Sequence, residues 1–256
     1  MNKFTVIAIA IILLGFGGLV AWSVASHTSN DLTNIDPTKV IEADDNMSGG
    51  IKEHIRGKED SPVVVIEYAD LQCPGCASLM PRMSKLHEQY GDRVAFVFRN
   101  YPLKDHYNAR AAAAACESAG FQGYYWQMLE ALYSNRASWM SLLGSERTAA
   151  FTEIFKQVAP DGDVEAFESG LGDERIEKKV NFDRDLGKKQ NVDATPSVYV
   201  NGAKIDISAE GITWDEIVKK IKEEIDKELK ANGLETGPKK GTEDKEEDKD
   251  TDEEKK

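Results

Sequence analysis

The sequence predicts an α/β domain in which a βαβ half and a ββα half share one mixed sheet. The first half is indicated by two short runs rich in β-branched residues, 62–70 and 93–98, which are typical of strands buried on both faces. The segment 74–90 between them carries apolar residues at helical spacing and is followed by a Gly-Asp pair. Because a helix connects them, the two strands are expected to be parallel neighbours.

The second half is indicated by a hairpin followed by a long amphipathic helix. Residues 196–207 contain two short apolar runs around Asn201-Gly202, a dipeptide typical of tight β-hairpins. The next segment begins after Thr213, a suitable N-cap, and stops at Asn232-Gly233. Its apolar residues share one helical face, which is expected to cover the sheet: Trp214, Ile217, Val218, Ile221, Ile225 and Leu229.

Between the two halves, residues 104–190 are expected to form a helical insertion. This range contains alanine-rich and amphipathic stretches separated by the breaks SAG, APDGD and SGLGD. No internal repeat is present. The folded domain is therefore assigned to residues 62–235.

The N-terminal residues 1–26 are predicted to be a transmembrane anchor or a signal peptide. Residues 4–25 carry no charge and as a helix would span about 33 Å, close to one bilayer core. An anchor is favoured because this stretch is longer than a usual signal core, although SVAS at 23–26 resembles a cleavage site. Lys3 precedes the stretch and the next basic residue is Lys39, which predicts a cytoplasmic N-terminus and an extracytoplasmic domain.

The segments that flank the domain are polar. Residues 27–61 lack a sustained apolar period, which predicts a stalk that holds the domain away from the membrane. Residues 236–256 are predicted to be a disordered tail, since the part from 239 onward has no apolar residue. The net charge of −13 argues against a nucleic-acid partner.

The three cysteines, Cys73, Cys76 and Cys116, favour redox chemistry over a structural role. A disulfide between Cys73 and Cys76 closes too short a loop to staple a fold. A metal site is not expected, because the four histidines are scattered and no second close cysteine pair exists. Residues three apart on a helical turn lie within disulfide reach, so this pair is able to open and close in place. Cys116, among alanines, is expected to be a small buried hydrophobe.

The position of the pair also predicts how it is activated. Cys73 is expected at the N-terminus of the helix, where free N–H groups and the helix dipole favour a thiolate. Cys73 is therefore the expected nucleophile, and Cys76, one turn inside, the residue that resolves the mixed disulfide. Pro74 suits the first helical turn because its missing N–H is not needed there.

In this order the motifs resemble the DsbA-like thiol:disulfide oxidoreductases, which have a thioredoxin fold with an inserted helical subdomain. The resemblance covers roughly residues 50–230 and rests on VVVIEYADLQCPGC, RNYPL, the alanine-rich AAAAACESAGFQGYYWQMLEALY and ATPSVYVNG. A lone CxxC motif is weak support for such a relation, whereas this ordered set is specific.

The resemblance implies roles for further residues. Pro196, after Thr195, corresponds to a cis proline that faces the disulfide and leaves backbone groups free for an extended substrate; an ordinary strand-initiating proline is the alternative. Glu67 corresponds to an acid that relays a proton to or from Cys76, and an edge-exposed carboxylate is the alternative. Gly75 departs from the strongly oxidising members, which carry histidine between the cysteines.

The function that this resemblance implies is the introduction of disulfides into exported, unfolded proteins, with the Cys73–Cys76 disulfide in place of a cofactor. A quinone-linked membrane partner, DsbB-like or VKOR-like, is expected to re-oxidise it. A membrane-tethered reductase or isomerase and a non-catalytic binding or holdase module are the alternatives. The expected redox potential lies above the value of about −270 mV for thioredoxin and below or near the value of about −120 mV for DsbA.

Overall fold

The computed structural model describes residues 32–239. The chain divides into residues 1–34 and 35–256, and the fold lies in the second unit. The predicted anchor or signal peptide, 1–26, and the tail from residue 240 onward lie outside the described residues. Within residues 32–239, no helix is both long and apolar enough to cross a membrane.

A five-stranded mixed sheet forms the centre, with the strand order β1-β3-β2-β4-β5. The strands β2 (Val64–Ala69) and β3 (Ala95–Asn100) are parallel and buried along their whole length. Strand β4 (Ser197–Val200) is antiparallel to β2 and forms the predicted hairpin with β5 (Ala203–Lys204). The predicted thioredoxin fold, with its βαβ and ββα halves, is confirmed.

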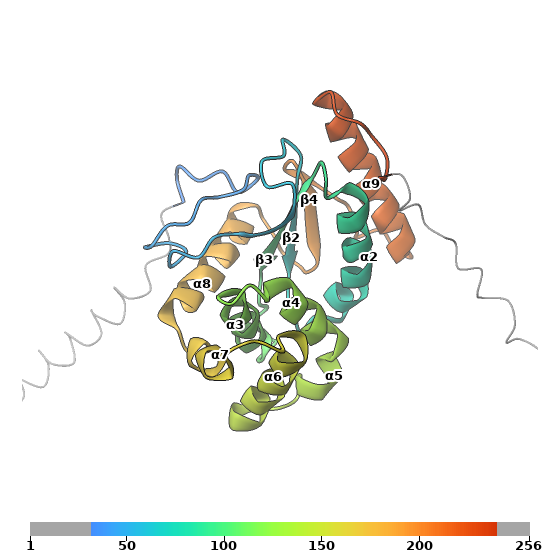
Figure 1. Cartoon of the computed structure of the whole chain (residues 1–256). Helices are drawn as coiled ribbons and strands as arrows, with labels where there is room; N and C mark the ends of the chain where they lie inside the picture. Colours follow the sequence, from blue (N-terminus) through green and yellow to red (C-terminus); the bar gives the residue numbers. More distant parts are fainter. Residues whose placement is uncertain (1–31, 240–256) are drawn as a thin grey trace, which may run out of the picture. The chain divides into compact units, whose positions relative to one another are not determined.

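Two helices cover one face of this sheet. Helix α2 (Pro74–Tyr90) connects β2 to β3, and α9 (Trp214–Ala231) follows the hairpin and lies beside α2 (Figure 1). Thr213 caps α9 in a capping box with Glu216, so the predicted cap is confirmed. The apolar face of α9 is buried in the same core as the β2 and β3 side chains that point to this side.

The insertion between the halves is helical, as the sequence predicts. Its helices lie below the sheet and along its other side in the view of Figure 1. In chain order they are α3 (Ala109–Gly120), α4 (Tyr125–Ser134), α5 (Arg136–Trp139), α6 (Gly144–Val158), α7 (Val164–Gly170) and α8 (Glu174–Lys189). Their alanine and aromatic side chains form a second apolar core, which also contains Cys73, Cys76 and Cys116.

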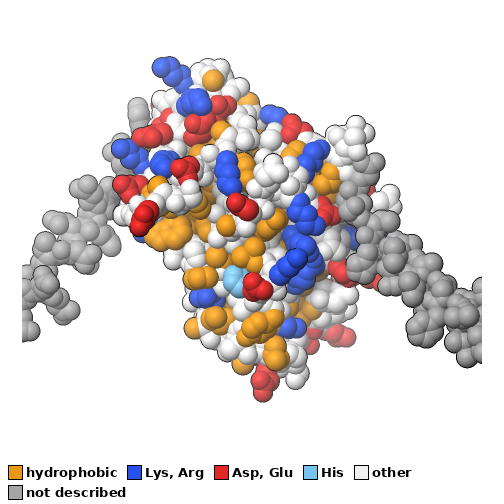
Figure 2. Space-filling model, turned by 180° about the vertical axis from the view of Figure 1, so that it is seen from behind, with side chains coloured by type: hydrophobic (Ala, Val, Ile, Leu, Met, Phe, Trp, Pro, Cys, Tyr) orange, Lys and Arg blue, Asp and Glu red, His pale blue; other side chains and the backbone are white. Residues whose placement is uncertain are grey.

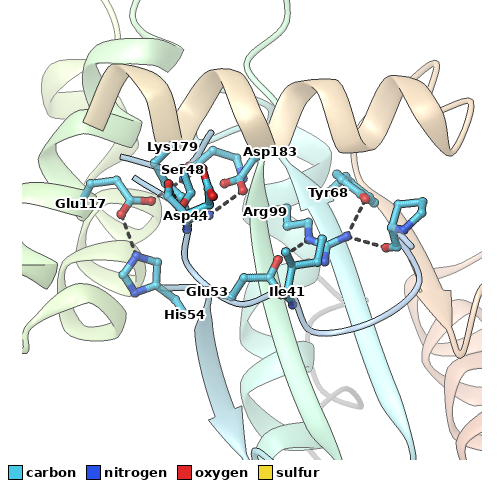
Figure 3. A network of polar contacts seen from close by, with 12 residues as sticks. Ile41, Asp44, Ser48, Glu53, His54, Tyr68, Arg99, Glu117, Lys179 and Asp183 are labelled. Atoms are coloured by element: carbon cyan, nitrogen blue, oxygen red, sulfur yellow. Dashed lines mark hydrogen bonds and ion pairs between the residues drawn. The ribbon is translucent and has the colours of Figure 1, made fainter. Parts of the chain in front are cut away.

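The prediction of a polar stalk over residues 27–61 is wrong for the part from Pro37 to Gly57, which packs against the domain. Residues His54–Gly57 form β1, antiparallel to β3 at the sheet edge. The physical reason lies in Arg99, a completely buried side chain of β3 (Figure 3). Its guanidinium pairs with Glu53 at 2.6 Å and donates hydrogen bonds to the carbonyl oxygens of Pro37 and Lys39. A buried cation requires such partners, so this polar segment is packed against the domain.

Candidate active site

The two cysteines of CPGC lie at the N-terminus of α2, close to the C-terminal end of β2. Cys73 is the N-cap, with extended backbone angles of φ −71° and ψ 127°, and Pro74 occupies the first helical position. No side chain caps this end of the helix, so its free N–H groups are available to the sulfur of Cys73. Cys73 is 7% exposed and Cys76 is completely buried, and both are free thiols.

The environment gives the two sulfurs opposite acidities. The pKa of Cys73 is lowered to about 5, first because the Cys76 thiol donates a hydrogen bond to it, and further by N–H groups of Cys76 and Gly75 and by Thr195. The pKa of Cys76 is raised well above its usual value, mainly because the sulfur is buried and also by that hydrogen bond to Cys73. At neutral pH Cys73 is therefore a thiolate that accepts a hydrogen bond from the Cys76 thiol.

The loop before β4 closes over Cys73. The Thr195–Pro196 peptide bond is cis, and the sulfur of Cys73 lies 3.4 Å from the carbonyl oxygen of Thr195. Gly75 lies against the same loop, since a Cβ atom at position 75 would be 3.2 Å from Cδ of Pro196 and 3.6 Å from the ring of Trp214. A side chain at position 75 therefore requires Pro196 to shift by a few tenths of an ångström, whereas the distance to Trp214 is an ordinary van der Waals contact.

Glu67 lies in the central strand β2, paired with Phe98 on one side and Val198 on the other. The alternative of an edge-exposed carboxylate is therefore wrong. Burial raises the pKa of Glu67 to about 8, with a further contribution from the nearby Cys73. At neutral pH Glu67 is therefore a neutral acid in most molecules, and it is able to donate a proton.

A small cavity lies beside Glu67, and neither cysteine of the pair lines it. Its volume is about 20 Å³, and its lining includes Glu67, Ser84, Glu130 and Tyr133. The Tyr133 hydroxyl is buried and has no hydrogen-bond partner among the described residues. A space of this size between two polar groups is large enough for about one water molecule.

Several polar residues around the pair were not singled out from the sequence. Asp70 and Gln72 precede Cys73 and are buried, and both make hydrogen bonds to the segment 103–108, which includes His106. The only sequence signal is that two polar residues, separated by Leu71, come between a buried strand and Cys73. Cys116 is completely buried in α3, as expected, and burial raises the pKa of its thiol well above the usual value.

Comparison with known proteins fits this geometry. A family model described as thioredoxin matches residues 50–223. The chain belongs to this family. It is 33% identical over 184 residues to a protein from Bacillus anthracis named probable disulfide bond formation protein D, a match that covers 68% of this chain and 77% of that protein.

The chain is also similar to proteins of other kinds. The crystal structure of oxidised BdbD from Bacillus subtilis is 27% identical, with a TM-score of 0.54, and the match covers 75% of this chain and 99% of that chain. A sodium/proton antiporter, NhaA 1, from Mycolicibacterium vanbaalenii is 27% identical over 157 residues, which are 60% of this chain and 24% of the antiporter. The chain thus spans about a quarter of the length of such relatives.

Proposed function

We propose that the chain is a protein-disulfide oxidoreductase that introduces disulfides into exported proteins through the Cys73–Cys76 pair. The observation that carries this proposal is the division of the pair into a thiolate near the surface and a completely buried thiol. A non-catalytic binding module needs no such division. The similarity to the Bacillus anthracis protein named for disulfide bond formation supports the same class of enzyme.

The proposed reaction is a thiol–disulfide exchange in two steps. A substrate thiolate attacks the sulfur of Cys73 in the oxidised pair, the Cys73–Cys76 bond breaks, and Cys76 leaves with the electron pair. A second thiolate of the same substrate then attacks the substrate sulfur that is bonded to Cys73 in the mixed disulfide. This step forms the substrate disulfide and expels the Cys73 thiolate. The substrate loses two electrons and gains a disulfide, and the enzyme becomes the dithiol.

Glu67 and Thr195–Pro196 have supporting roles in this proposal. Cys76 needs a proton as it leaves, because its pKa is far above neutral, and Glu67 is a neutral acid that supplies one. The cavity next to Glu67 offers a site for the water that returns a proton from solvent. The backbone of the Thr195–Pro196 loop lies beside Cys73 and is the proposed binding site for an extended substrate segment.

Apolar surface for an unfolded substrate is present close to the pair. Tyr107 and Leu143 are large hydrophobic residues that are 60% and 63% exposed. The residues next to them in the chain, Asn108 and Leu142, are joined by a 2.8 Å hydrogen bond, which holds the two segments together. The backbone N–H of Asn108 also donates to the side chain of Gln72, the residue before Cys73, and this contact connects both segments to the active site. Figure 2 shows hydrophobic side chains gathered between charged ones on the face opposite that of Figure 1.

The location and partners of the enzyme are also part of the proposal. The apolar stretch 4–25 in the sequence supports a single N-terminal anchor and an extracytoplasmic catalytic domain. A quinone-linked membrane protein, DsbB-like or VKOR-like, is the proposed electron acceptor, as the resemblance to the DsbA-like enzymes implies. A tethered reductase is the second candidate, favoured by Gly75, because no side chain at that position donates a hydrogen bond to the Cys73 thiolate.

The test is catalysed oxidation of an unfolded, reduced protein by a substoichiometric amount of the chain with excess oxidised glutathione. Cys73→Ala is expected to abolish catalysis, and Cys76→Ala to trap a mixed disulfide at Cys73. Cys116→Ala, the matched control, is expected to retain activity. Full activity of Cys73→Ala would contradict the proposed function.

A further inference from the structure

The backbone of Asp70 contacts both cysteines of the pair. Its carbonyl oxygen accepts a hydrogen bond from the backbone N–H of Cys73 at 3.0 Å. Its own N–H donates to the sulfur of Cys76, with 3.5 Å between nitrogen and sulfur. These two groups belong to different peptide units, so the N–H of Asp70 acts on the electrostatics of Cys76 separately from the contact of its carbonyl oxygen with Cys73.

The side chain of Asp70 is held from another part of the fold. Its carboxylate is completely buried, and its two oxygens accept hydrogen bonds from the backbone N–H groups of Gln72, at 2.7 Å, and Leu103, at 2.8 Å. The remaining donor is Nδ1 of His106, 2.9 Å from Oδ2. Because a carboxylate only accepts, Nδ1 is the ring nitrogen that carries the proton.

His106 differs from the other two donors because it donates from a side chain, whereas Gln72 and Leu103 donate from the backbone. It lies in the connection between β3 and α3, and 26% of its side chain is exposed. Among the described residues it is the side chain that ties the Asp70 carboxylate to this connection. A change at position 106 therefore alters the support of Asp70 without removing an atom that contacts either sulfur.

We propose that His106 is a positioning residue for the resolving cysteine, acting through the Asp70 carboxylate on the N–H that points at the sulfur of Cys76. This inference rests on the proposed function, in which Cys76 resolves the mixed disulfide. An N–H aimed at sulfur favours the thiolate, which is the attacking form. Burial opposes that form at Cys76, and the hydrogen bond from Asp70 partly offsets the effect of burial on its pKa.

The step affected is the second half of the exchange between the dithiol and a small disulfide such as oxidised glutathione. The Cys73 thiolate attacks glutathione disulfide, forms a mixed disulfide and releases one glutathione thiolate. Cys76 then gives up its proton and attacks the sulfur of Cys73. The Cys73–Cys76 bond forms, the second glutathione leaves as thiolate, and it takes up a proton. His106 acts on the Cys76 step and leaves the first attack by Cys73 unchanged.

The experiment measures the lifetime of the Cys73–glutathione mixed disulfide in the full chain. The dithiol form is mixed with oxidised glutathione, quenched with acid at intervals, and analysed by intact-mass spectrometry. For His106→Ala the lifetime is expected to increase about fivefold, the cost of weakening one hydrogen bond. His106→Asn keeps an amide donor at the place of Nδ1 and is expected to stay within about twofold of the native chain. Lys104→Ala, at an exposed neighbour, is the matched control.

A second readout separates positioning from general damage. The rate of Cys73 alkylation by iodoacetamide is expected to be the same in all of these variants. An unchanged lifetime in His106→Ala, an equal change in alkylation rate, or a failure of His106→Asn to restore the lifetime would each overturn the inference. If His106→Ala does not fold, His106→Gln takes its place. Its amide lies one methylene further out, so the lifetime of the mixed disulfide is expected to increase by less than the roughly fivefold change expected for His106→Ala. Cys76→Ala must trap the mixed disulfide; if it does not, the proposed function itself fails.

Discussion

The hydrogen bond between the two active-site sulfurs gives the sharpest quantitative prediction. The Cys76 thiol is the first cause of the lowered pKa of Cys73, ahead of the backbone N–H groups and Thr195. Replacing Cys76 with alanine removes this donor and leaves the helix N-terminus intact. A hydrogen bond to a charged group contributes about 1.5–3 kcal/mol, which corresponds to about one to two pKa units. We therefore expect the pKa of Cys73 to rise from about 5 to about 6–7 in Cys76→Ala.

The assay is the absorbance of the thiolate near 240 nm as a function of pH, checked by the pH dependence of iodoacetamide alkylation. Cys76→Ser keeps a donor at the same place, so its pKa is expected to lie between those of the native chain and Cys76→Ala. Cys116→Ala controls for the remaining buried thiol and is expected to leave the titration unchanged. If the pKa of Cys73 stays near 5 in Cys76→Ala, the helix N-terminus and the Thr195 loop dominate instead, and this reasoning is refuted.

Three further predictions concern Cys73, Glu67 and Arg99. The lowered pKa of Cys73 stabilises the folded dithiol above the usual thiol pKa of 9.0, and this contribution is lost as the pH falls through about 5. Urea unfolding at pH 7 and pH 4 should show the dithiol losing about 1–2 kcal/mol more than the disulfide form, allowing for solvent screening; equal losses would contradict this. Glu67→Gln removes the proton donor and should slow the release of Cys76 at least about tenfold in stopped-flow exchange, with alkylation of Cys73 unaffected. Arg99→Met leaves Glu53 buried without its cation and should cost about 3–5 kcal/mol in urea unfolding. The control Lys156→Met, at an exposed ion pair, should leave the urea midpoint close to that of the native chain.

The sequence predicts the parts of the fold that rest on local patterns. Strands β2 and β3, helix α2, the Asn201-Gly202 hairpin and the cap at Thr213 each have a strong periodic or turn signal. The position of the cysteines at the start of α2 follows from the same local signals.

The features that the sequence does not predict depend on contacts between distant segments. Strand β1 has no apolar alternation, because it is a short edge strand whose residues are only partly buried. The partners of Arg99 lie 31 to 62 positions away in the chain, and nothing local marks them. The Asp70–His106 contact likewise joins two loops 36 residues apart.

The redox potential of the Cys73–Cys76 pair tests the central claim most directly. With a pKa of about 5, the Cys73 thiolate favours the reduced form at pH 7 more than a thioredoxin-type thiol of pKa about 7 does. The difference is at most about 2.3 kcal/mol or 50 mV, and solvent screening at Cys73, which is 7% exposed, reduces it to about 40 mV. Equilibration of the full chain with glutathione buffers is therefore expected to give about −230 mV, above the value of about −270 mV for thioredoxin. A potential at or below that of thioredoxin would contradict the oxidase and favour the tethered reductase.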